Sequence, residues 1–364
     1  MHLLRLLPLL ALTLALRNLP AQTNTLIDAQ TATALSTEGR QTLYRFMQQM
    51  PDGTEAGLAI LDGDSTVYYG VRRRNDTLQS VDNANSRFGI GSVSKVFTAS
   101  LLAALVEEGA LALDDTVNAA YDFPFADGIA FTYRQLATHT SGLPRLPNNM
   151  PGMLLGPQNP YAGYDGPQLE TYLQKNLSVA PDGNGGYSNL GFGLLGYTLG
   201  SRIDTGGYAA ALQSRVLDPI GLPATSFGKD STRGPVIPGF DEDGRPASYW
   251  DFTEAMGAAG AIVSTPRDMA TFLRAQLDST RTVLALTREE QVTLSPQQGV
   301  GLGWQILHPT PEYTVHWHNG AVGGYRAFAA IDTQRERGIV LLVNVLRTDN
   351  LVDQTAMSFL RPKN

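Results

Sequence analysis

Apolar residues recur at helical spacing along residues 92–109, just after the short glycine-bearing stretch 88–91. The recurring positions are Phe97, Leu101, Leu102, Leu105 and Val106. This spacing places them on one side of a helix, and Gly109 stands where a helix commonly ends. The pattern therefore predicts a short extended piece that runs directly into a strong amphipathic helix.

Strand-like and helix-like patterns alternate along the rest of the chain. Short β-rich runs occur at residues 57–60, 66–71, 301–307, 313–317, 324–331 and 338–345. Helical patterns occur at residues 25–50, 169–176, 193–199, 208–217, 266–277 and 351–360. The turn residues 62–64, Asp-Gly-Asp, predict that the first two strands form a hairpin. The polar segment 72–85 is expected to be a loop.

The strands lie at both ends of the chain, and helices and loops fill the middle. This order implies an α+β fold, in which an antiparallel sheet built from both ends is flanked by terminal helices and carries an all-α inserted subdomain. The α/β part is expected to span about residues 25–110 and 255–364, and the helical insertion about residues 111–254. Within the long proline-rich loop 145–167, the tyrosines are expected to pack the loop down, or else to wall a pocket.

Composition narrows the class of protein. The 364 residues are 43% hydrophobic and 17% charged, with a net charge of −7, which is typical of a globular chain. An acidic chain without a basic stripe is not expected to bind nucleic acid, and no polybasic segment favours stable membrane association. Cysteine is absent, so disulfides and a thiolate nucleophile are excluded.

The first residues have the character of a secretory leader. An apolar run from Leu6 to Leu16 follows Arg5, and it is too short to span a bilayer. We expect a signal peptide at residues 1–21 and a mature domain at residues 22–364, located in the periplasm or secreted. The alternative is an uncleaved anchor that leaves the domain facing the same side.

Chemistry-bearing residues occur in three separate segments. Ser92 and Lys95 lie three residues apart, on one face of the predicted helix. A hydroxyl beside an amine at a helix N-terminus suggests a serine nucleophile activated by a lysine, although a capping serine beside a solvated lysine gives the same pattern. Tyr187 and Asn189 lie in a glycine-rich loop before a helix, and an extended backbone there would point both side chains into one cleft. Residues 318–321 end a β-rich run.

The ordered set of motifs resembles the serine β-lactamase and penicillin-binding-protein superfamily. Its closest branch contains class C β-lactamases, D-alanyl-D-alanine carboxypeptidases, esterases and D-aminopeptidases. The resemblance rests on Ser92-Val-Ser-Lys95, Tyr187-Ser-Asn189 and His318-Asn-Gly320, and on the stretches that begin at Leu136, Gly186, Ala259 and Gly301. It covers nearly the whole mature chain and implies a β-lactamase/transpeptidase-like fold.

The resemblance also implies roles for individual residues. Ser92 would form an acyl-enzyme, and Lys95 and Tyr187 would share its deprotonation, with Tyr187 as general base and then acid for the leaving group. Which of the two takes the first proton stays open. Asn189 would bind Lys95 and the substrate amide. The backbone N–H groups of Ser92 and Ala321 would form the oxyanion hole.

The third motif departs from that of peptidases and β-lactamases. Its residues His318, Asn319 and Gly320, with Ala321, would line the substrate site, but Asn319 replaces the usual threonine or serine that helps to hold a substrate carboxylate. Ala321 replaces a residue that often carries a hydroxyl. Arg326 either supplies a substitute charge or is a solvated strand residue. Both replacements weaken the expectation of a β-lactam or D-Ala-D-Ala substrate.

The sequence thus predicts a secreted serine hydrolase that cleaves an amide or ester of a small molecule or peptide. A class C-like β-lactamase and a catalytically inactive ligand-binding homologue are the alternatives. The natural substrate and the oligomeric state stay open.

The remaining candidate residues are expected to be structural. The second serine–lysine pair, Ser226 and Lys229, lies among glycines and prolines and is expected to be loop. His139 is expected to organise a turn, and His316 to be structural. No metal or other cofactor is expected.

Overall fold

The strands form one large antiparallel sheet that joins the two ends of the chain. The computed structural model describes residues 35–150, 159–180, 186–310 and 312–361. In sheet order the strands are β3 (Thr77–Val81), β2 (Ser65–Arg74), β1 (Glu55–Asp62), β14 (Arg337–Val343), β13 (Tyr325–Asp332), β12 (Tyr313–Val322), β11 (Gln305–Thr310), β10 (Gln298–Val300) and β9 (Val292–Ser295). The central pairing of β1 with β14 runs from Ala56 opposite Val343 to Asp62 opposite Arg337. The α+β prediction with a sheet built from both ends is therefore confirmed.

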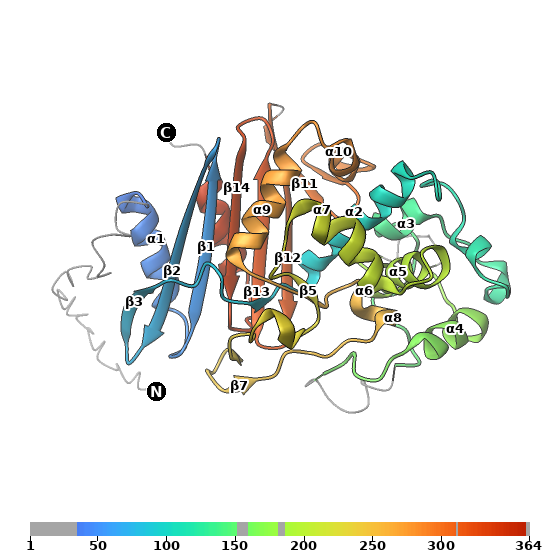
Figure 1. Ribbon diagram of the computed structural model, residues 1–364, viewed down its shortest axis with the longest axis horizontal. Coiled ribbons are helices and arrows are strands. Elements are labelled where there is room, and N and C mark those ends of the chain that lie inside the picture. Colours follow the sequence, from blue (N-terminus) through green and yellow to red (C-terminus); the bar gives the residue numbers. More distant parts are fainter. Residues whose placement is uncertain (1–34, 151–158, 181–185, 311, 362–364) are drawn as a thin grey trace, which may run out of the picture.

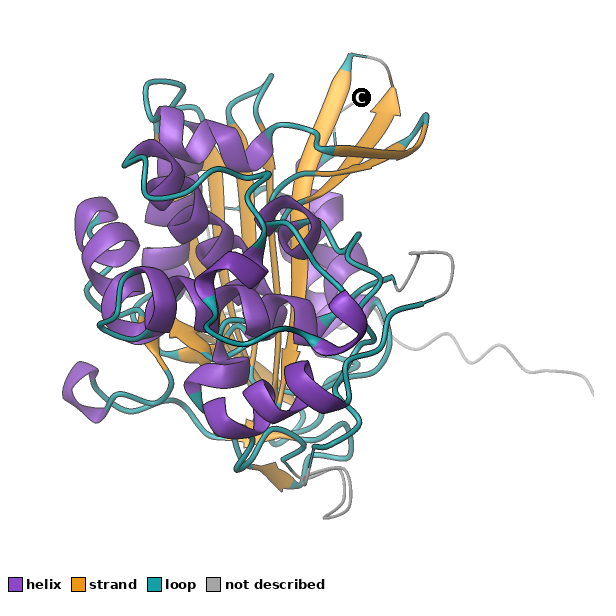
Figure 2. Cartoon of the chain, turned by 90° about the vertical axis from the view of Figure 1, so that its right-hand side faces the viewer, coloured by secondary structure: helices purple, strands orange, loops and turns teal. Residues whose placement is uncertain are grey.

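Helices cover both faces of this sheet. They are α1 (Thr37–Met47), α2 (Ser94–Glu107), α3 (Tyr133–Ala137), α4 (Gly166–Lys175), α5 (Asn189–Thr198), α6 (Tyr208–Leu212), α7 (Asp218–Ile220), α8 (Glu254–Gly257), α9 (Pro266–Leu277), α10 (Thr282–Arg288) and α11 (Leu351–Leu360). On one face α9 packs on β1, β13 and β14, and on the other α11 packs on β13 and β14 and contacts α1. Figure 1 shows α2 to α8 grouped beside β12, and Figure 2 shows these helices in front of the strands.

Strand alternation divides the buried side chains between two cores. Every residue of β13 is buried, as expected for a strand that is covered on both faces. Ala327 and Ala329 belong to the larger core, which includes the helices beside β12, whereas Phe328 and Ala330 belong to the core under α1 and α11. The terminal helices thus bury the face of the sheet that lies opposite the helical part.

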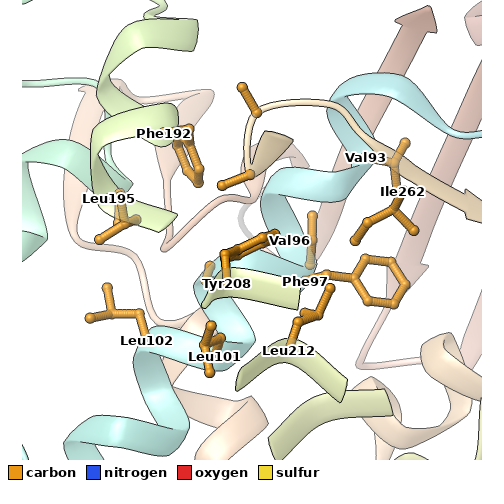
Figure 3. Close-up of a cluster of buried hydrophobic side chains, with 14 of the residues drawn as sticks. Val93, Val96, Phe97, Leu101, Leu102, Phe192, Leu195, Tyr208, Leu212 and Ile262 are labelled. Carbon is orange, nitrogen blue, oxygen red and sulfur yellow. The ribbon is translucent and has the colours of Figure 1, made fainter. Parts of the chain in front are cut away.

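Helix α2 lies at the centre of the larger core. A 3-10 turn, η1 (Gly91–Val93), precedes it, and every residue from Ser94 to Leu105 is buried. The prediction of a strongly amphipathic helix is therefore wrong, because packed elements surround α2 on all sides. Figure 3 shows its apolar side chains between Phe192 and Tyr208 of the helical part and Ile262. Gly109 follows the helix at a φ of 71°, as its expected C-terminal position requires.

Polar side chains within α2 fix it against a neighbouring segment. Thr98 Oγ1 donates to the Ala258 carbonyl at 2.8 Å, and Ser94 Oγ accepts from the Ile262 N–H at 3.0 Å. Ile262 begins β8 (Ile262–Ser264), which forms a small sheet with β4 (Phe88–Gly89) and β5 (Ser226–Phe227). The hydroxyl of Ser94 therefore has a structural partner, which leaves Ser92 as the serine available for chemistry.

Several expected bounds need correction. The segment 72–85 is not a loop, because β2 continues to Arg74 and β3 follows a tight turn in which Asn75 and Asp76 both have positive φ. This is the backbone of a primed hairpin turn. The first helix begins at Thr37, capped by Ser36, and residues 25–34 lie outside the described part. Strands β9 and β10 were not expected, and neither was a short hairpin of two-residue strands, β6 (Gly239–Phe240) and β7 (Pro246–Ala247).

Two further expectations concern the ends and the subdivision of the chain. The predicted signal peptide at residues 1–21 lies outside the described residues. Among the helices of the described part, none has the length and apolar character needed to cross a membrane. The bounds expected for the α/β part and the helical insertion stay a prediction.

The backbone of β12 lies directly against the turn that carries Ser92. A Cβ atom at Gly320 would stand 1.9 Å from the Ile90 carbonyl oxygen, and one at Gly91 would stand 2.6 Å from the Ala321 nitrogen. Glycine is required at both positions, because any side chain would push the two backbones apart. This contact sets the distance between the first and third predicted motifs.

We expect Gly320→Ala to destabilise the protein by about 1–3 kcal/mol through overpacking. Gly338→Ala is a matched control in the same sheet, because its Cβ atom would stand 3.4 Å from the nearest atom, in ordinary contact. Urea unfolding of the two variants and the wild type measures the difference. Equal loss of stability in both variants would show that the β12 contact imposes no special constraint.

Candidate active site

Ser92 and Lys95 lie within hydrogen-bonding distance at the start of α2. Lys95 Nζ is 3.0 Å from Ser92 Oγ, 2.9 Å from Asn189 Oδ1 and 2.6 Å from the carbonyl oxygen of Ala259. The three partners come from η1, α5 and the segment before β8. The alternative of a capping serine beside a solvated lysine does not fit, because Lys95 is fully buried.

The surroundings of Lys95 disfavour its charged form. Burial lowers the pKa of Lys95 well below its ordinary value, and the positive charge of Arg145 lowers it further. Two of its partners, Asn189 Oδ1 and the Ala259 carbonyl, can only accept hydrogen bonds. A neutral amine has two hydrogens for these acceptors, which leaves its lone pair for the Ser92 hydroxyl.

Tyr187 is the third member of this group, and it directly precedes Ser188, which caps α5. Its ring centroid lies 4.8 Å from Lys95 Nζ, and its hydroxyl hydrogen-bonds Ser92. Burial raises the pKa of Tyr187 above its ordinary value, whereas the Ser92 hydrogen bond and the charge of Arg145 lower it in part. Tyr187 is therefore held as a neutral phenol.

His139 fixes the segment that carries Tyr187. Its Nδ1 accepts from the Ser188 N–H at 3.1 Å, and its ring centroid lies 4.3 Å from that of Tyr187. His139 has a φ of 62°, which is unusual for a residue with a side chain. Burial lowers its pKa well below its ordinary value, and a neutral ring is required for Nδ1 to accept. The turn expected at His139 is thus present, and its imidazole contacts the candidate site.

Asn189 is oriented by Tyr161, one of the tyrosines of the proline-rich loop. Its Oδ1 accepts from Lys95, and its Nδ2 donates to the Tyr161 hydroxyl at 2.7 Å. Asn189 is the first residue of α5, not part of the extended loop expected there, and Ser188 caps the helix. Tyr161 also stacks on Phe252 with centroids 4.5 Å apart. It lines the cavity beside Ser92 and is not only packing, whereas Tyr164 is fully buried.

The third segment reaches the site from the strand β12. His318 is buried, and its Nδ1–H donates to the Asn319 carbonyl at 2.6 Å, so its Nε2 carries a lone pair. Burial lowers the pKa of His318 to about 3, and its ring centroid lies 6.2 Å from that of Tyr187. Gly320 and Ala321 follow against the Ser92 turn. The motif lies inside β12, which continues to Val322, and not at the end of a strand.

Asn319 contacts a residue far along the chain. Its Nδ2 donates to Asp353 Oδ2 at 2.5 Å, and Arg326 Nη2 lies 3.1 Å from Asp353 Oδ1. Arg326 is buried, so it is not a solvated strand residue, and its charge is compensated by Asp353. Burial raises the pKa of Asp353, and Arg326 and Asn319 oppose the increase.

These groups surround one cavity of about 440 Å³. Its lining residues are Ser92, Arg145, Pro160, Tyr161, Tyr187, Asn189, Trp250, Phe252, Ala259, Gly260, Asn319, Ala321 and Arg326. A second cavity of about 450 Å³ lies by α11 and contains neither Ser92 nor Tyr187. The structure thus brings the three predicted segments to one cavity, with His318 and Lys95 behind its wall.

The remaining candidates lie elsewhere or have structural partners. Ser226 begins β5 and accepts from the buried Arg87 at 2.5 Å, and Lys229 pairs with Asp251 at 3.1 Å. They form no second serine–lysine site. His316 Nε2 donates to the Arg288 carbonyl at 3.0 Å.

The sequence reasoning did not single out Arg145 within its loop, and it missed Trp250, Phe252 and Asp353 as neighbours of the site. The first three lie in loops and follow no periodic pattern. Asp353 lies in the first turn of the closing helix. The one sequence signal for Arg145 is its positive charge directly after a turn-rich segment. The other three residues have no local sequence signal that indicates a role in the site.

Comparison with known proteins identifies relatives along almost the whole described chain. The family model described as beta-lactamase matches residues 43–358. The human protein named beta-lactamase-like 1 is 25% identical over 324 residues, which are 83% of this chain and 63% of that protein. The chain therefore spans less than two thirds of the human relative. The D-alanyl-D-alanine-carboxypeptidase/endopeptidase AmpH of Escherichia coli (strain K12) is 25% identical, over 80% of this chain and 79% of AmpH.

Solved structures show the same fold. A class C beta lactamase from Rhodobacter sphaeroides superimposes with a TM-score of 0.73 at 21% identity, over 89% of this chain and 98% of that one. The octameric penicillin-binding protein homologue from Pyrococcus abyssi gives a TM-score of 0.73 at 22% identity, over 89% of this chain and 76% of that one. The predicted superfamily and fold are confirmed.

The buried histidines predict an acid-dependent loss of stability. Burial lowers the pKa of His316 to about 4, from 6.5 in the unfolded chain. Between these values the unfolded chain binds a proton that the folded protein does not, so stability is fully present above about pH 6.5 and falls toward pH 4. Each such histidine contributes about 1.4 kcal/mol per pH unit to this loss. His316→Asn should therefore show a shallower acid dependence in urea unfolding between pH 7 and 5.

His308→Asn is the matched control, because His308 lies on the adjacent strand β11 and is only partly buried. An acid dependence in His316→Asn as steep as that of the wild type would contradict the assignment of His316 as a buried neutral ring.

Proposed function

The chain belongs to the beta-lactamase family, and from this membership we propose that it is an exported serine hydrolase that forms an acyl-enzyme on Ser92. The observation that carries the proposal is the 3.0 Å approach of Ser92 Oγ to the amine of a fully buried lysine, Lys95. A serine hydroxyl is a weak nucleophile until a base removes its proton. Export to the periplasm or exterior rests on the leader predicted at residues 1–21.

Lys95 takes the first proton in this proposal. Its neutral amine has a lone pair toward Ser92, whereas the raised pKa of Tyr187 makes a tyrosinate base unfavourable. As Ser92 attacks the carbonyl carbon, its proton moves to Lys95 Nζ. The resulting ammonium finds its three acceptors already in place, at Asn189, Ala259 and the former hydroxyl oxygen.

Tyr187 then protonates the leaving group. Its phenol hydrogen-bonds Ser92 and lies beside Lys95, so the proton lost to the leaving group is replaced from the lysine ammonium. Water hydrolyses the acyl-enzyme in the second half of the reaction, by the same transfers in reverse. In this order Tyr187 acts first as an acid, and Lys95 is the base.

The backbone N–H groups of Ser92 and Ala321 form the oxyanion hole of the proposal. The two backbone segments are in direct contact at Gly91 and Gly320, because neither residue has a side chain that would keep them apart. One such donor is worth about 3 kcal/mol of transition-state stabilisation. Asn189, held by Tyr161, presents its amide beside Lys95 to the substrate amide or ester.

A β-lactamase is the second candidate, supported by relatives that bear that name. One from Lysobacter lactamgenus is 26% identical over 85% of this chain. Against it, Asn319 donates to Asp353 at 2.5 Å, so the central residue of the third motif is already engaged on the protein. We therefore favour an amide or ester substrate over a β-lactam. The assembled Ser92, Lys95 and Tyr187 disfavour an inactive binding homologue.

We expect a fluorescent phosphonate probe that reacts with activated serines to label the wild type at Ser92 and to leave Ser92→Ala unlabelled. Ser100→Ala is the matched control, because the buried hydroxyl of Ser100 donates to the Val96 carbonyl within the same helix and should not affect labelling. Peptide mass spectrometry locates the adduct. An unlabelled wild type, or equal labelling of Ser92→Ala, would refute the nucleophile. Parallel turnover of p-nitrophenyl esters, D-amino-acid peptides and nitrocefin ranks the substrate classes.

A further inference from the structure

The two arginines that line the cavity differ in their surroundings. Arg326 is buried on β13 and pairs with Asp353 at 3.1 Å, and Asp353 also accepts from Asn319. The cation on the third-motif side of Ser92 is therefore compensated by a carboxylate of the protein. An anionic substrate group on this side would compete with Asp353.

Arg145 lies on the other side, with the helical part. Its guanidinium carbon is 5.2 Å from the Tyr187 ring centroid, and its side chain is exposed. Within the described residues no carboxylate forms an ion pair with it. The charge of Arg145 acts on Lys95, Tyr161 and Tyr187, whose pKa values it lowers.

The backbone holds Arg145 in this place. Its carbonyl oxygen accepts from the N–H groups of Asn189 and Leu190, both at 3.1 Å. These donors belong to the first turn of α5, where N–H groups have no partner inside the helix. The backbone of Arg145 is thus fastened to the helix that supplies Asn189, and its guanidinium lies beside the Tyr187 ring.

The lining of the cavity adds to this asymmetry. Its described lining residues include no aspartate or glutamate. Tyr161, Trp250 and Phe252 form an aromatic wall next to the arginine side, with centroids of Tyr161 and Trp250 5.8 Å apart. This lining fits a substrate group with an apolar body, for the aromatic wall, and an anionic end, for Arg145.

We propose that Arg145 binds a carboxylate of the substrate on the helical side of Ser92, and that the enzyme selects anionic esters or amides by this contact. The inference rests on the proposed function. A planar guanidinium offers paired donors that match a carboxylate. The proposed carboxylate site therefore lies on the opposite side of Ser92 from the third motif. On the third-motif side, Asp353 already binds Arg326 and Asn319.

The test compares two matched pairs of esters. One pair carries the charge on the acyl side, as p-nitrophenyl hydrogen glutarate against p-nitrophenyl valerate. The other carries it on the leaving group, as the butyrate ester of 4-hydroxybenzoate against that of its methyl ester. For each pair the ratio of kcat/KM, anionic over neutral, is measured in the wild type, Arg145→Gln, Arg145→Lys and Arg45→Gln. Because each ratio compares esters on one enzyme, general changes in Ser92 reactivity cancel.

We expect the wild-type ratio in one pair to fall roughly tenfold in Arg145→Gln and to be partly kept in Arg145→Lys. Arg45→Gln removes the same charge from the distant helix α1 and should leave the ratio unchanged. The wild-type ratio should also shrink as salt rises, because Arg145 is exposed. The pair that responds identifies the side of the scissile bond that carries the carboxylate.

Ratios that are equal in the wild type and Arg145→Gln for both pairs would overturn the role of Arg145. Equal losses in Arg145→Gln and Arg45→Gln would do the same, because they would reflect only net charge. Either result can occur while both enzymes still hydrolyse the neutral esters through Ser92. Failure of the proposed function would instead abolish turnover of every ester in the wild type.

Discussion

The burial of one lysine is the constraint on which this structure depends. Lys95 is fully enclosed, and its amine meets oxygen atoms from three segments that are far apart in the chain, at Ser92, Asn189 and Ala259. A buried ammonium without a carboxylate partner is costly, so the neutral amine is favoured. Both stability and the proposed chemistry then require α2, α5 and the segment before β8 to stay in register, since a small shift would leave the amine or its acceptors unpaired.

The sheet and its neighbours supply that register. β1 and β14 join the two ends of the chain, and β12 presses its glycine backbone onto the turn that carries Ser92. The helical part supplies Tyr187 and Asn189 from the start of α5, where His139 holds the preceding residue. The site therefore lies at the junction of the sheet and the helical part, and each contributes groups that the other lacks. A second polar cluster, of Asn319, Asp353 and Arg326, anchors β12 to the closing helix and sets the electrostatic character of one side of the cavity.

Patterns of period two and 3.6 predicted the strands near both ends and the helices at 266–277 and 351–360, and ordered motifs identified Ser92, Lys95, Tyr187 and the strand at 318–321. Where the pattern failed, tertiary contacts decided. α2 has no solvent face, because the helical part covers the side that an isolated helix would expose. β3 is polar because it is an edge strand, and its Asn75-Asp76 turn was overlooked. Arg145 and Asp353 are single residues whose partners lie far along the chain, so no local pattern assigns them a role.

The protonation state of Lys95 tests the account most directly. The chain has only four lysines, so protein labelled with carbon-13 at lysine Cε gives a spectrum that can be followed signal by signal through a pH titration. The signal that Lys95→Met lacks identifies Lys95. We predict that this signal titrates well below the ordinary lysine pKa of 10.5. A Lys95 signal that titrates at 10.5 would show that the buried amine is an ammonium, and the proposed activation of Ser92 would be wrong.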